Sequence, residues 1–233
     1  MTVKAPADAR QRIFTSAVRL FARKGFADVG IRDIAKEAKV NMAMISYYFG
    51  SKTGILRAIL ASYIEKYYDV LDQDVDKCGD DTPQYVHCLA GNLMRFYRDN
   101  IELAVVATDA GELDIPEIHD EAMRMNAPHR PMLSRFFTGL GLDTEDPASM
   151  ALVRGFLTNM VLGHFKDRFV WEQIRAKHPE LDKVAAETAY FPEPVFDDAF
   201  YEGYAHLLAH FYLGGVKAIA GRQVPAVDEG RGK

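Results

Sequence analysis

The stretch from Ile31 to Lys52, IRDIAKEAKVNMAMISYYFGSK, carries side chains whose types and spacing are suited to contacts with nucleic acid. Arg32 lies on the polar side of one predicted helix. The outward side of the next predicted helix carries Met42, Met44, Ser46 and Tyr47. Lys52 follows at the start of a third helix, where a phosphate group would approach the helix N-terminus. The chemistry that this stretch predicts is noncovalent binding of a DNA duplex.

Two short helices joined by a tight turn must position these side chains. Ile31, Ile34, Ala35 and Ala38 recur at the spacing of one buried helical stripe. Asn41 is suited to cap the second helix, Met42 to Tyr48, which buries Ile45 with help from Phe49 and is too short to be stable alone. Gly50 is suited to the position after that helix, and Ser51 to the cap of the third. The pattern predicts a helix-turn-helix.

At these residues the chain resembles the TetR family of transcriptional repressors. The resemblance spans about Arg10 to Leu60, and its motif residues are Ile34-Ala35, Ala38, Val40, Tyr47-Tyr48-Phe49 and Ser51-Lys52. Lys39 stands where the family usually has a turn glycine, so a side chain occupies a position that favours positive φ. Gly30 replaces the usual Thr or Ser cap, and Ser46 replaces a common Tyr.

The resemblance implies a role for each exposed side chain of this unit. Base-reading positions are occupied by Arg32, Met42, Ala43, Met44 and Ser46, and phosphate positions by Gly30, Tyr47, Tyr48 and Lys52. Of the base-reading residues, Arg32 alone can make a bidentate contact with guanine, worth about 1–3 kcal/mol, whereas the methionines and Ala43 can contact thymine methyl groups. We therefore predict a T-rich operator core flanked by G. Packing within the domain is the alternative role for the methionines and for the two tyrosines.

The charge distribution supports this assignment. The whole chain has a formal net charge of −5, but residues 1–57 contain 11 Lys/Arg and only 4 Asp/Glu, and the remainder contains 17 and 29. A basic N-terminal unit is expected to contact phosphates, while an acidic body would be repelled by DNA and would help to orient the encounter. We predict a helix-turn-helix DNA-binding domain at 1–57, an effector-binding and dimerisation domain at 58–221, and a flexible tail at 222–233.

No segment shows the sustained alternation of a β-strand, so the predicted fold is all-α: an N-terminal three-helix helix-turn-helix head and a larger C-terminal helical body for ligand binding and dimerisation. The other expected segments are an arm at 1–9, helices at 10–24, 55–76 and 84–110, a broken helix at 112–130, helices at 131–140 and 147–177, a connection at 182–194 and a helix from 196. The last two long helices resemble the pair that forms a homodimeric four-helix bundle in the family. Such a dimer would place two recognition helices about 34 Å apart on a near-palindromic site.

Aromatic and methionine residues of the body either line an apolar cavity or form core. Their spacing does not separate these two interpretations, but the resemblance implies control by a small-molecule effector and so favours a cavity. The candidate ligand-binding residues are Arg95, Phe96, Phe156, Met160 and His164. Arg95 or His164 would supply the polar contact.

Other possible sites in the sequence are less specific. His206 and His210 are four residues apart, a spacing that can hold a metal ion, but no nearby Cys or carboxylate completes a set. We favour a hydrogen-bonded or interfacial role and predict no metal and no cofactor. The acidic residues between 112 and 121 are interpreted as a solvated face. No Ser or Cys nucleophile motif and no Gly-rich phosphate loop is present, so an enzyme is not expected.

The location predicted from composition is the cytoplasm. Cys78 and Cys88 match no metal or redox motif and fit a reducing compartment. The N-terminus lacks the apolar run of a signal peptide, and no window is long and apolar enough to span a membrane. The predicted function is a ligand-responsive transcriptional repressor. A DNA-binding activator without small-molecule control is the nearer alternative, and a helical enzyme or protein-interaction module is the more distant one.

Overall fold

The computed structural model describes residues 6–73, 81–188 and 194–220, and that part of the chain is helical without strands. The helices are α1 (Pro6–Lys24), α2 (Ile31–Ala38), α3 (Met42–Phe49), α4 (Lys52–Asp72), α6 (Thr82–Ala110), α7 (Pro116–Asn126), the 3₁₀ turn η1 (Ala127–His129), α8 (Arg130–Gly139), α9 (Pro147–Val153), α10 (Phe156–Lys177), α11 (Glu180–Thr188) and α12 (Asp198–Ala220). The all-α fold predicted from the sequence is confirmed.

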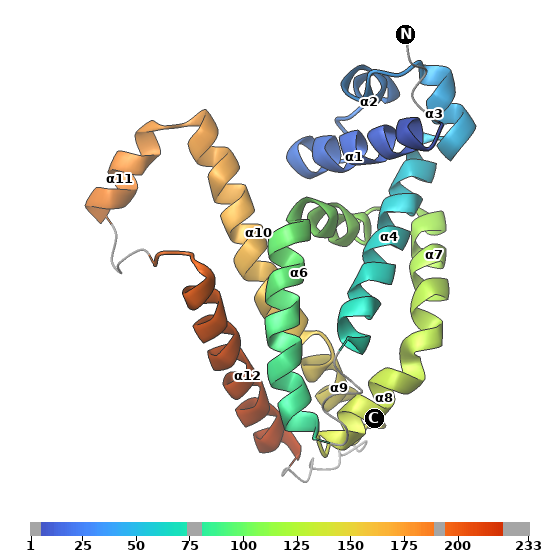
Figure 1. The fold of residues 1–233 in the computed structure, drawn as a ribbon. Coiled ribbons are helices and arrows are strands. Elements are labelled where there is room, and N and C mark those ends of the chain that lie inside the picture. Colours follow the sequence, from blue (N-terminus) through green and yellow to red (C-terminus); the bar gives the residue numbers. More distant parts are fainter. Residues whose placement is uncertain (1–5, 74–80, 189–193, 221–233) are drawn as a thin grey trace, which may run out of the picture.

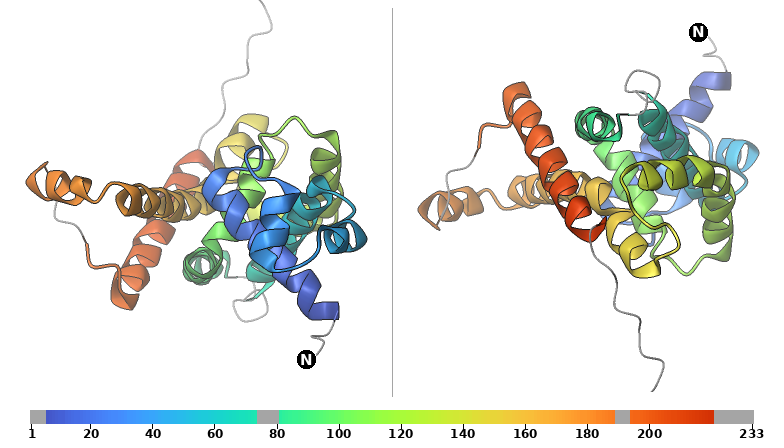
Figure 2. Two further views of the ribbon diagram at one scale, coloured as in Figure 1. Left: turned by 90° about the horizontal axis from the view of Figure 1, so that it is seen from above. Right: turned by 90° about the horizontal axis from the view of Figure 1, so that it is seen from below.

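Helices α1, α2 and α3 form a small head at one end of the molecule, and the other helices form the body (Figure 1). Helix α6 lies at the centre of the body, where α4, α10 and α12 pack against it. Its buried face is long, and Val86, Leu93 and Tyr97 are among its fully enclosed side chains. The two views of Figure 2 show α10 and α12 on the opposite side of α6 from α7. Helix α11 extends outward from the end of α10.

Helix α4 joins the head to the body without interruption. Its first turn packs against α3, and its later turns pack against α6 and α7. The expected boundary between residues 57 and 58 therefore falls inside one continuous helix. The head and the body are therefore connected through the backbone hydrogen bonds of a single helix.

Three segments differ from the sequence prediction. Helix α1 begins at Pro6, so residues 6–9 are helical and do not form an arm, since Pro is well accommodated in a first helical turn. The helix expected at 147–177 is two helices, because Gly155 leaves the helical conformation between α9 and α10. The connection expected from residue 182 begins as α11, whose acidic first turn complements the helix dipole.

Several predictions concern residues outside the described ranges. These are the first five residues of the arm, the end of the helix expected at 55–76, Cys78, residues 189–193 of the connection, and the tail at 222–233. Within the described ranges, no helix combines the length and apolar character that a membrane crossing requires.

Candidate DNA-binding interface

The turn between α2 and α3 is held by backbone geometry that the sequence anticipates. The carboxylate of Asp33 accepts a hydrogen bond from the backbone N–H of Gly30 at 2.9 Å, so the start of α2 is capped although Gly30 has no side chain. At the other end Lys39 adopts φ 54° and ψ 50°, the left-handed conformation expected of a residue in the family's glycine position. Its N–H bonds to carbonyl groups of the last turn of α2. The turn is therefore closed at both sides.

Helix α3 is short, and both of its ends are fixed. Asn41 accepts a hydrogen bond from the N–H of Ala43 at 3.0 Å, as predicted for the cap. Gly50 follows the helix with φ 74° and donates its N–H to Ser46. One side chain of α3, Ile45, is completely buried and attaches the helix to the core of the head. Because only one face is buried, the opposite face is left for a partner.

The exposed face of α3 carries most of the predicted contact residues. Tyr47 is 82% exposed and Met42 45% exposed, and Ala43 and Ser46 are also exposed. Gly30 and Arg32 are exposed beside them, at the start of α2. The structure thus brings six of the nine predicted residues to accessible positions on two adjacent helices.

Met44 and Tyr48 are placed differently from the other residues of α3. Both are half-buried and pack against the core of the head. The ring of Tyr48 meets that of Tyr47 edge to face, with centroids 4.9 Å apart. Packing, which was the alternative role for these residues, accounts for a large part of their surface. A DNA contact by either one would use only its exposed edge.

Lys52 makes contacts that the sequence did not reveal. Its Nζ donates hydrogen bonds to the carbonyl oxygens of Phe26 at 2.8 Å and Val29 at 2.9 Å, and it lies 4.2 Å from the centre of the Phe26 ring. These contacts connect α4 to the loop before α2. An ammonium group has three donors, so one remains for a phosphate. Lys52 therefore has a structural role in the head in addition to the predicted contact.

Helix α1 supports the helix-turn-helix from behind. Arg12 donates a hydrogen bond from Nη1 to the carbonyl of Ala38 at 3.1 Å, at the end of α2. The guanidinium of Arg10 lies 5.3 Å from the centre of the Phe49 ring, at the end of α3. Both arginines thus contact the two helices that must be held in place.

Gly54 is a further residue that sequence reasoning missed. A Cβ atom at this position would lie 1.8 Å from the carbonyl oxygen of Phe49. The backbone at the end of α3 therefore touches the first turn of α4 directly. The backbone N–H of Gly54 also donates a hydrogen bond to Oγ of Ser51, the cap of α4, at 3.0 Å. Only glycine allows this approach. The angle between α3 and α4 depends on this close contact.

Comparison with known proteins agrees with this geometry. Residues 13–59 match the family described as "Bacterial regulatory proteins, tetR family". The "Probable HTH-type transcriptional regulator YttP" of Bacillus subtilis is 43% identical over 63 residues, which are 27% of this chain and 30% of that protein. The helix-turn-helix head of this chain is therefore similar to the DNA-binding domain of TetR-family transcriptional regulators.

Solved structures of the TetR fold extend the similarity to the body. The fatty acid degradation regulator FadR from Bacillus halodurans superimposes with a TM-score of 0.62 at 16% identity, covering 92% of this chain and 98% of that one. The ketosteroid regulator KstR2 of Mycobacterium tuberculosis gives 0.56 at 15% identity, covering 92% and 96%. At these identities the likeness concerns the fold alone. The curated sequence relatives match between 23% and 29% of this chain, and the chain spans about a third of their length or less.

The five residues proposed for ligand binding do not meet in one place in the body. Phe96 is buried against Tyr63 and Tyr97, whereas Phe156 is exposed and stacks on Phe211. Arg95 lines an open groove between α6 and α12, and Met160 packs against the core. His164 is half-buried among aromatic rings of α12 and its preceding segment. Helical periodicity indicates which face of each helix is apolar. It does not indicate which of these faces meet in the folded protein.

The body contains a different small cavity, of about 40 Å³, enclosed by α4, α6, α8, α9, α10 and α12. Its apolar lining includes Phe136 and Phe137, and its polar groups include Tyr67 of α4, Thr158 of α10 and Tyr212 of α12. The hydroxyls of Tyr67 and Thr158 lie 2.8 Å apart. Burial raises the pKa of Tyr67, and raises that of Tyr212 to about 12. Both phenols are therefore neutral hydrogen-bond donors at pH 7.

His206 and His210 do lie together, and the structure adds a third histidine to them. Their Nε2 atoms are 2.9 Å apart, and the ring of His87 from α6 lies 5.1 Å from His206 and 4.8 Å from His210, centre to centre. Burial lowers the pKa of His87, and so do the neighbouring His210 and His206. Sequence reasoning missed His87 because more than a hundred residues separate it from the pair.

Proposed function

We propose that this TetR-family protein is a repressor that binds a near-palindromic operator as a homodimer and is released by a small molecule bound in the body. The observation that carries the proposal is the accessible face of α3 beside Arg32, on a helix fixed at both ends. Such a face can enter a major groove without rearrangement. The nine predicted contact residues, and a division of labour between residues 1–57 and 58–221, are part of the proposal. Access to chromosomal DNA places the protein in the cytoplasm.

A homodimer is supported by apolar side chains exposed along α10 and α12. Leu207 is 67% and Phe211 62% exposed on α12, and Val170 and Trp171 are exposed on α10. The ring of Phe211 stacks on that of Phe156 of α10, with centroids 6.3 Å apart, so the two helices present one apolar surface. An exposed apolar surface of this kind marks an interface. A second copy of the same pair would cover it by two-fold symmetry.

The proposed effector site is the cavity beside α4. In this conformation its volume of about 40 Å³ accommodates little more than water, whereas pockets for small organic ligands are roughly 300–1,000 Å³. A ligand must therefore enlarge it, and two of its lining residues, Tyr67 and Leu71, belong to the helix that begins in the head. Enlargement that displaces α4 would change the position of α3, and the effect is limited by the ligand's preference for the enlarged state.

The lining indicates the class of effector. It is mostly apolar and aromatic, with phenolic hydroxyls inside and the guanidinium of Arg154 in the lining. An apolar molecule with one acidic or hydrogen-bonding end matches this arrangement. FadR and KstR2, which share the fold, are named for fatty acid degradation and for ketosteroids. A fatty acid and a steroid are therefore reasonable first probes.

The first experiment is selection of the full chain against a randomised duplex pool at fixed, near-physiological salt. Enrichment of a near-palindrome, with two half-sites one helical turn apart, is the expected result. If folded protein freed of bound ligand enriches no sequence, the repressor proposal is wrong and an interaction module becomes the better interpretation. Enrichment of a motif that no probe molecule releases would favour the activator without small-molecule control.

Dimerisation is tested separately from DNA binding. Leu207→Glu and Phe211→Glu together should yield a monomer in sedimentation, because they place charge in the proposed interface. Val184→Glu is a matched control, since Val184 is also exposed but belongs to α11 and not to α10 or α12. If the double variant remains a dimer, the interface lies elsewhere on the molecule.

A further inference from the structure

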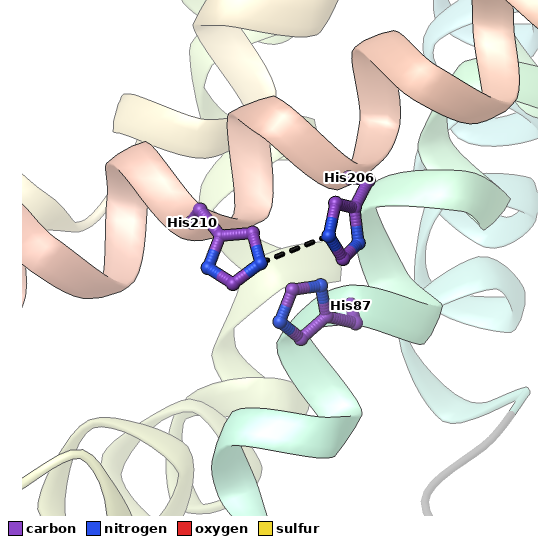
Figure 3. Close-up of side chains that lie close together, drawn as sticks. All are labelled: His87, His206 and His210. Atoms are coloured by element: carbon purple, nitrogen blue, oxygen red, sulfur yellow. Dashed lines mark hydrogen bonds between the residues drawn. The ribbon is translucent and has the colours of Figure 1, made fainter.

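The histidine cluster between α6 and α12 has the composition of a metal site. His87, His206 and His210 each offer a ring nitrogen, and the three ligand atoms all lie within 4.8 Å of one another. Figure 3 shows the three rings turned toward one another between the two helices. Neutral imidazole is the commonest protein ligand for zinc and its neighbours in the transition series. Three imidazoles suffice for a tetrahedral site with one open position.

The distances are close to those that a metal ion requires. With metal–nitrogen bonds of about 2.0–2.1 Å and tetrahedral angles, ligand nitrogens are about 3.3 Å apart. The Nε2 atoms of His206 and His210 are 2.9 Å apart, slightly closer than this. The three ligand atoms lie within 4.8 Å of one another, so the His87 ring must approach the pair on α12 for all three nitrogens to bond one ion.

A second observation concerns His87 alone. Its Nδ1 atom is buried and has no hydrogen-bond partner within the described residues. An unpaired polar atom that is shielded from solvent destabilises the fold, so such atoms usually have a ligand, a water or an ion. His206 and His210 stand next to it, but they hydrogen-bond to each other. A metal ion bound by the three rings would give the Nδ1 atom of His87 a partner.

From these observations we propose that His87, His206 and His210 form a binding site for a divalent transition-metal ion, with Zn²⁺ as the reference occupant and water in the fourth position. The site joins α12 to α6. It lies on the edge of α12 that faces α6, whereas Phe211 lies toward α10, so a dimer formed through α10 and α12 leaves the histidines at its rim. A metal ion bound there crosslinks two helices of one chain. The proposal does not depend on operator binding or on the effector.

The test uses the full chain without a polyhistidine tag, freed of metal by chelation. Titration with Co²⁺, followed by displacement with Zn²⁺, should show one ion per chain and the visible absorption of four-coordinate cobalt. Mg²⁺, which prefers oxygen ligands, should produce no signal. Absence of the cobalt spectrum, with no Zn²⁺ binding by calorimetry, would overturn the proposal.

Variants decide whether three residues act together. His87→Gln should weaken Zn²⁺ binding at least tenfold, because a pair on one helix is a poorer site than three ligands from two helices. His206→Gln with His210→Gln should abolish it. His178→Gln is the control, since His178 is exposed and pairs with Glu180 outside the cluster. Unchanged affinity in the His87→Gln protein would reduce the site to a pair on α12 and refute the proposal.

A measurement on the wild-type chain tests the site without relying on variants, which could fail to fold. Diethyl pyrocarbonate modifies accessible histidines, and the modified residues can be located by mass spectrometry. Zn²⁺ should slow the modification of His206 and His210 at least several-fold and leave His178 reactive. Equal reactivity of all three residues with and without Zn²⁺ would contradict metal binding at the cluster.

Discussion

The head and the body of this protein are built on different kinds of contact. In the head, the ends of the helices are fixed by residues close to them in the chain: Asn41 caps α3, Ser51 caps α4, and Gly50 ends α3. In the body, the cavity is lined by six helices and the histidine cluster joins residues far apart in sequence. The ends of the helices that present the surface for DNA are therefore encoded locally. The sites that could respond to a signal exist only through tertiary packing.

The largest expected effect breaks the local geometry of the head. Gly54→Ala would place Cβ 1.8 Å from the carbonyl oxygen of Phe49, so α3 and α4 must separate. Forced overpacking costs about 3 kcal/mol or more at such a backbone contact, and we expect loss of operator binding together with a lower free energy of unfolding in denaturant titration.

Gly91→Ala in α6 is the matched control for that substitution. A Cβ at Gly91 would lie 3.6 Å from the flexible end of Arg95, an ordinary contact. This variant should be unchanged or more stable by up to about 1 kcal/mol, because Ala favours a helix over Gly. If both glycine variants behave alike, the close approach of α3 to α4 does not control the head.

Arg32→Ala tests whether the exposed surface of the head reads bases. Loss of a bidentate guanine contact should relax preference at one position of each half-site by about 1–3 kcal/mol, measured by competition among operator variants at one salt concentration. Lys36→Ala, on an exposed position of the same helix, is the control. Equal weakening of all sequences by Arg32→Ala would assign Arg32 to phosphate contact.

Lys52→Met separates a structural role from a DNA contact. The substitution removes the hydrogen bonds to the carbonyl oxygens of Phe26 and Val29, and hydrogen bonds from charged groups contribute about 1.5–3 kcal/mol. We therefore expect thermal unfolding of the free protein at a lower temperature, in addition to weaker binding of every duplex. A variant that binds DNA less well but unfolds like the wild type would show that Lys52 acts on phosphate alone.

The same contrast explains how much could be predicted from the sequence. The two helices, their caps and the buried Ile45 follow from short-range patterns, and even the positive φ of Lys39 was anticipated. The partners of Lys52 lie in a loop more than twenty residues away, and the constraint on Gly54 comes from the end of another helix. Neither the contacts of Lys52 nor the constraint on Gly54 produces a periodic pattern in the sequence. His87 is part of the histidine cluster only because α12 packs on α6, which the sequence pattern does not predict.

In the body, Tyr67→Phe tests the connection between α4 and the cavity. The hydroxyl of Tyr67 pairs with that of Thr158 on α10, and its loss should cost about 1 kcal/mol of stability. If the cavity is the effector site, the same change should alter the effector concentration needed for operator release. Tyr204→Phe, outside the cavity lining, is the control. Equal effects of the two variants on release would place the effector site elsewhere.

The smallest expected effect concerns the ion pair between α4 and α7. Arg57 donates a hydrogen bond from Nη2 to Glu121 at 2.8 Å, which lowers the pKa of the Glu121 carboxyl, while partial desolvation opposes the shift and Arg124 adds to it. Because the folded-state pKa is lowered, the pair stabilises the fold above the ordinary pKa of 4.5, and this contribution is lost as the pH falls from there through the folded-state pKa.

A double-mutant cycle of Arg57→Ala and Glu121→Gln measures this pair directly. The arginine side chain is about half exposed, so solvent screening limits the coupling to roughly 0.2–1 kcal/mol at pH 7. The coupling should decrease as the pH falls below 4.5 and vanish once the carboxyl of folded Glu121 is protonated. A coupling that persists in acid would show that packing, and not charge, connects the two helices. In that case the mechanical link between the head and the body would be independent of pH.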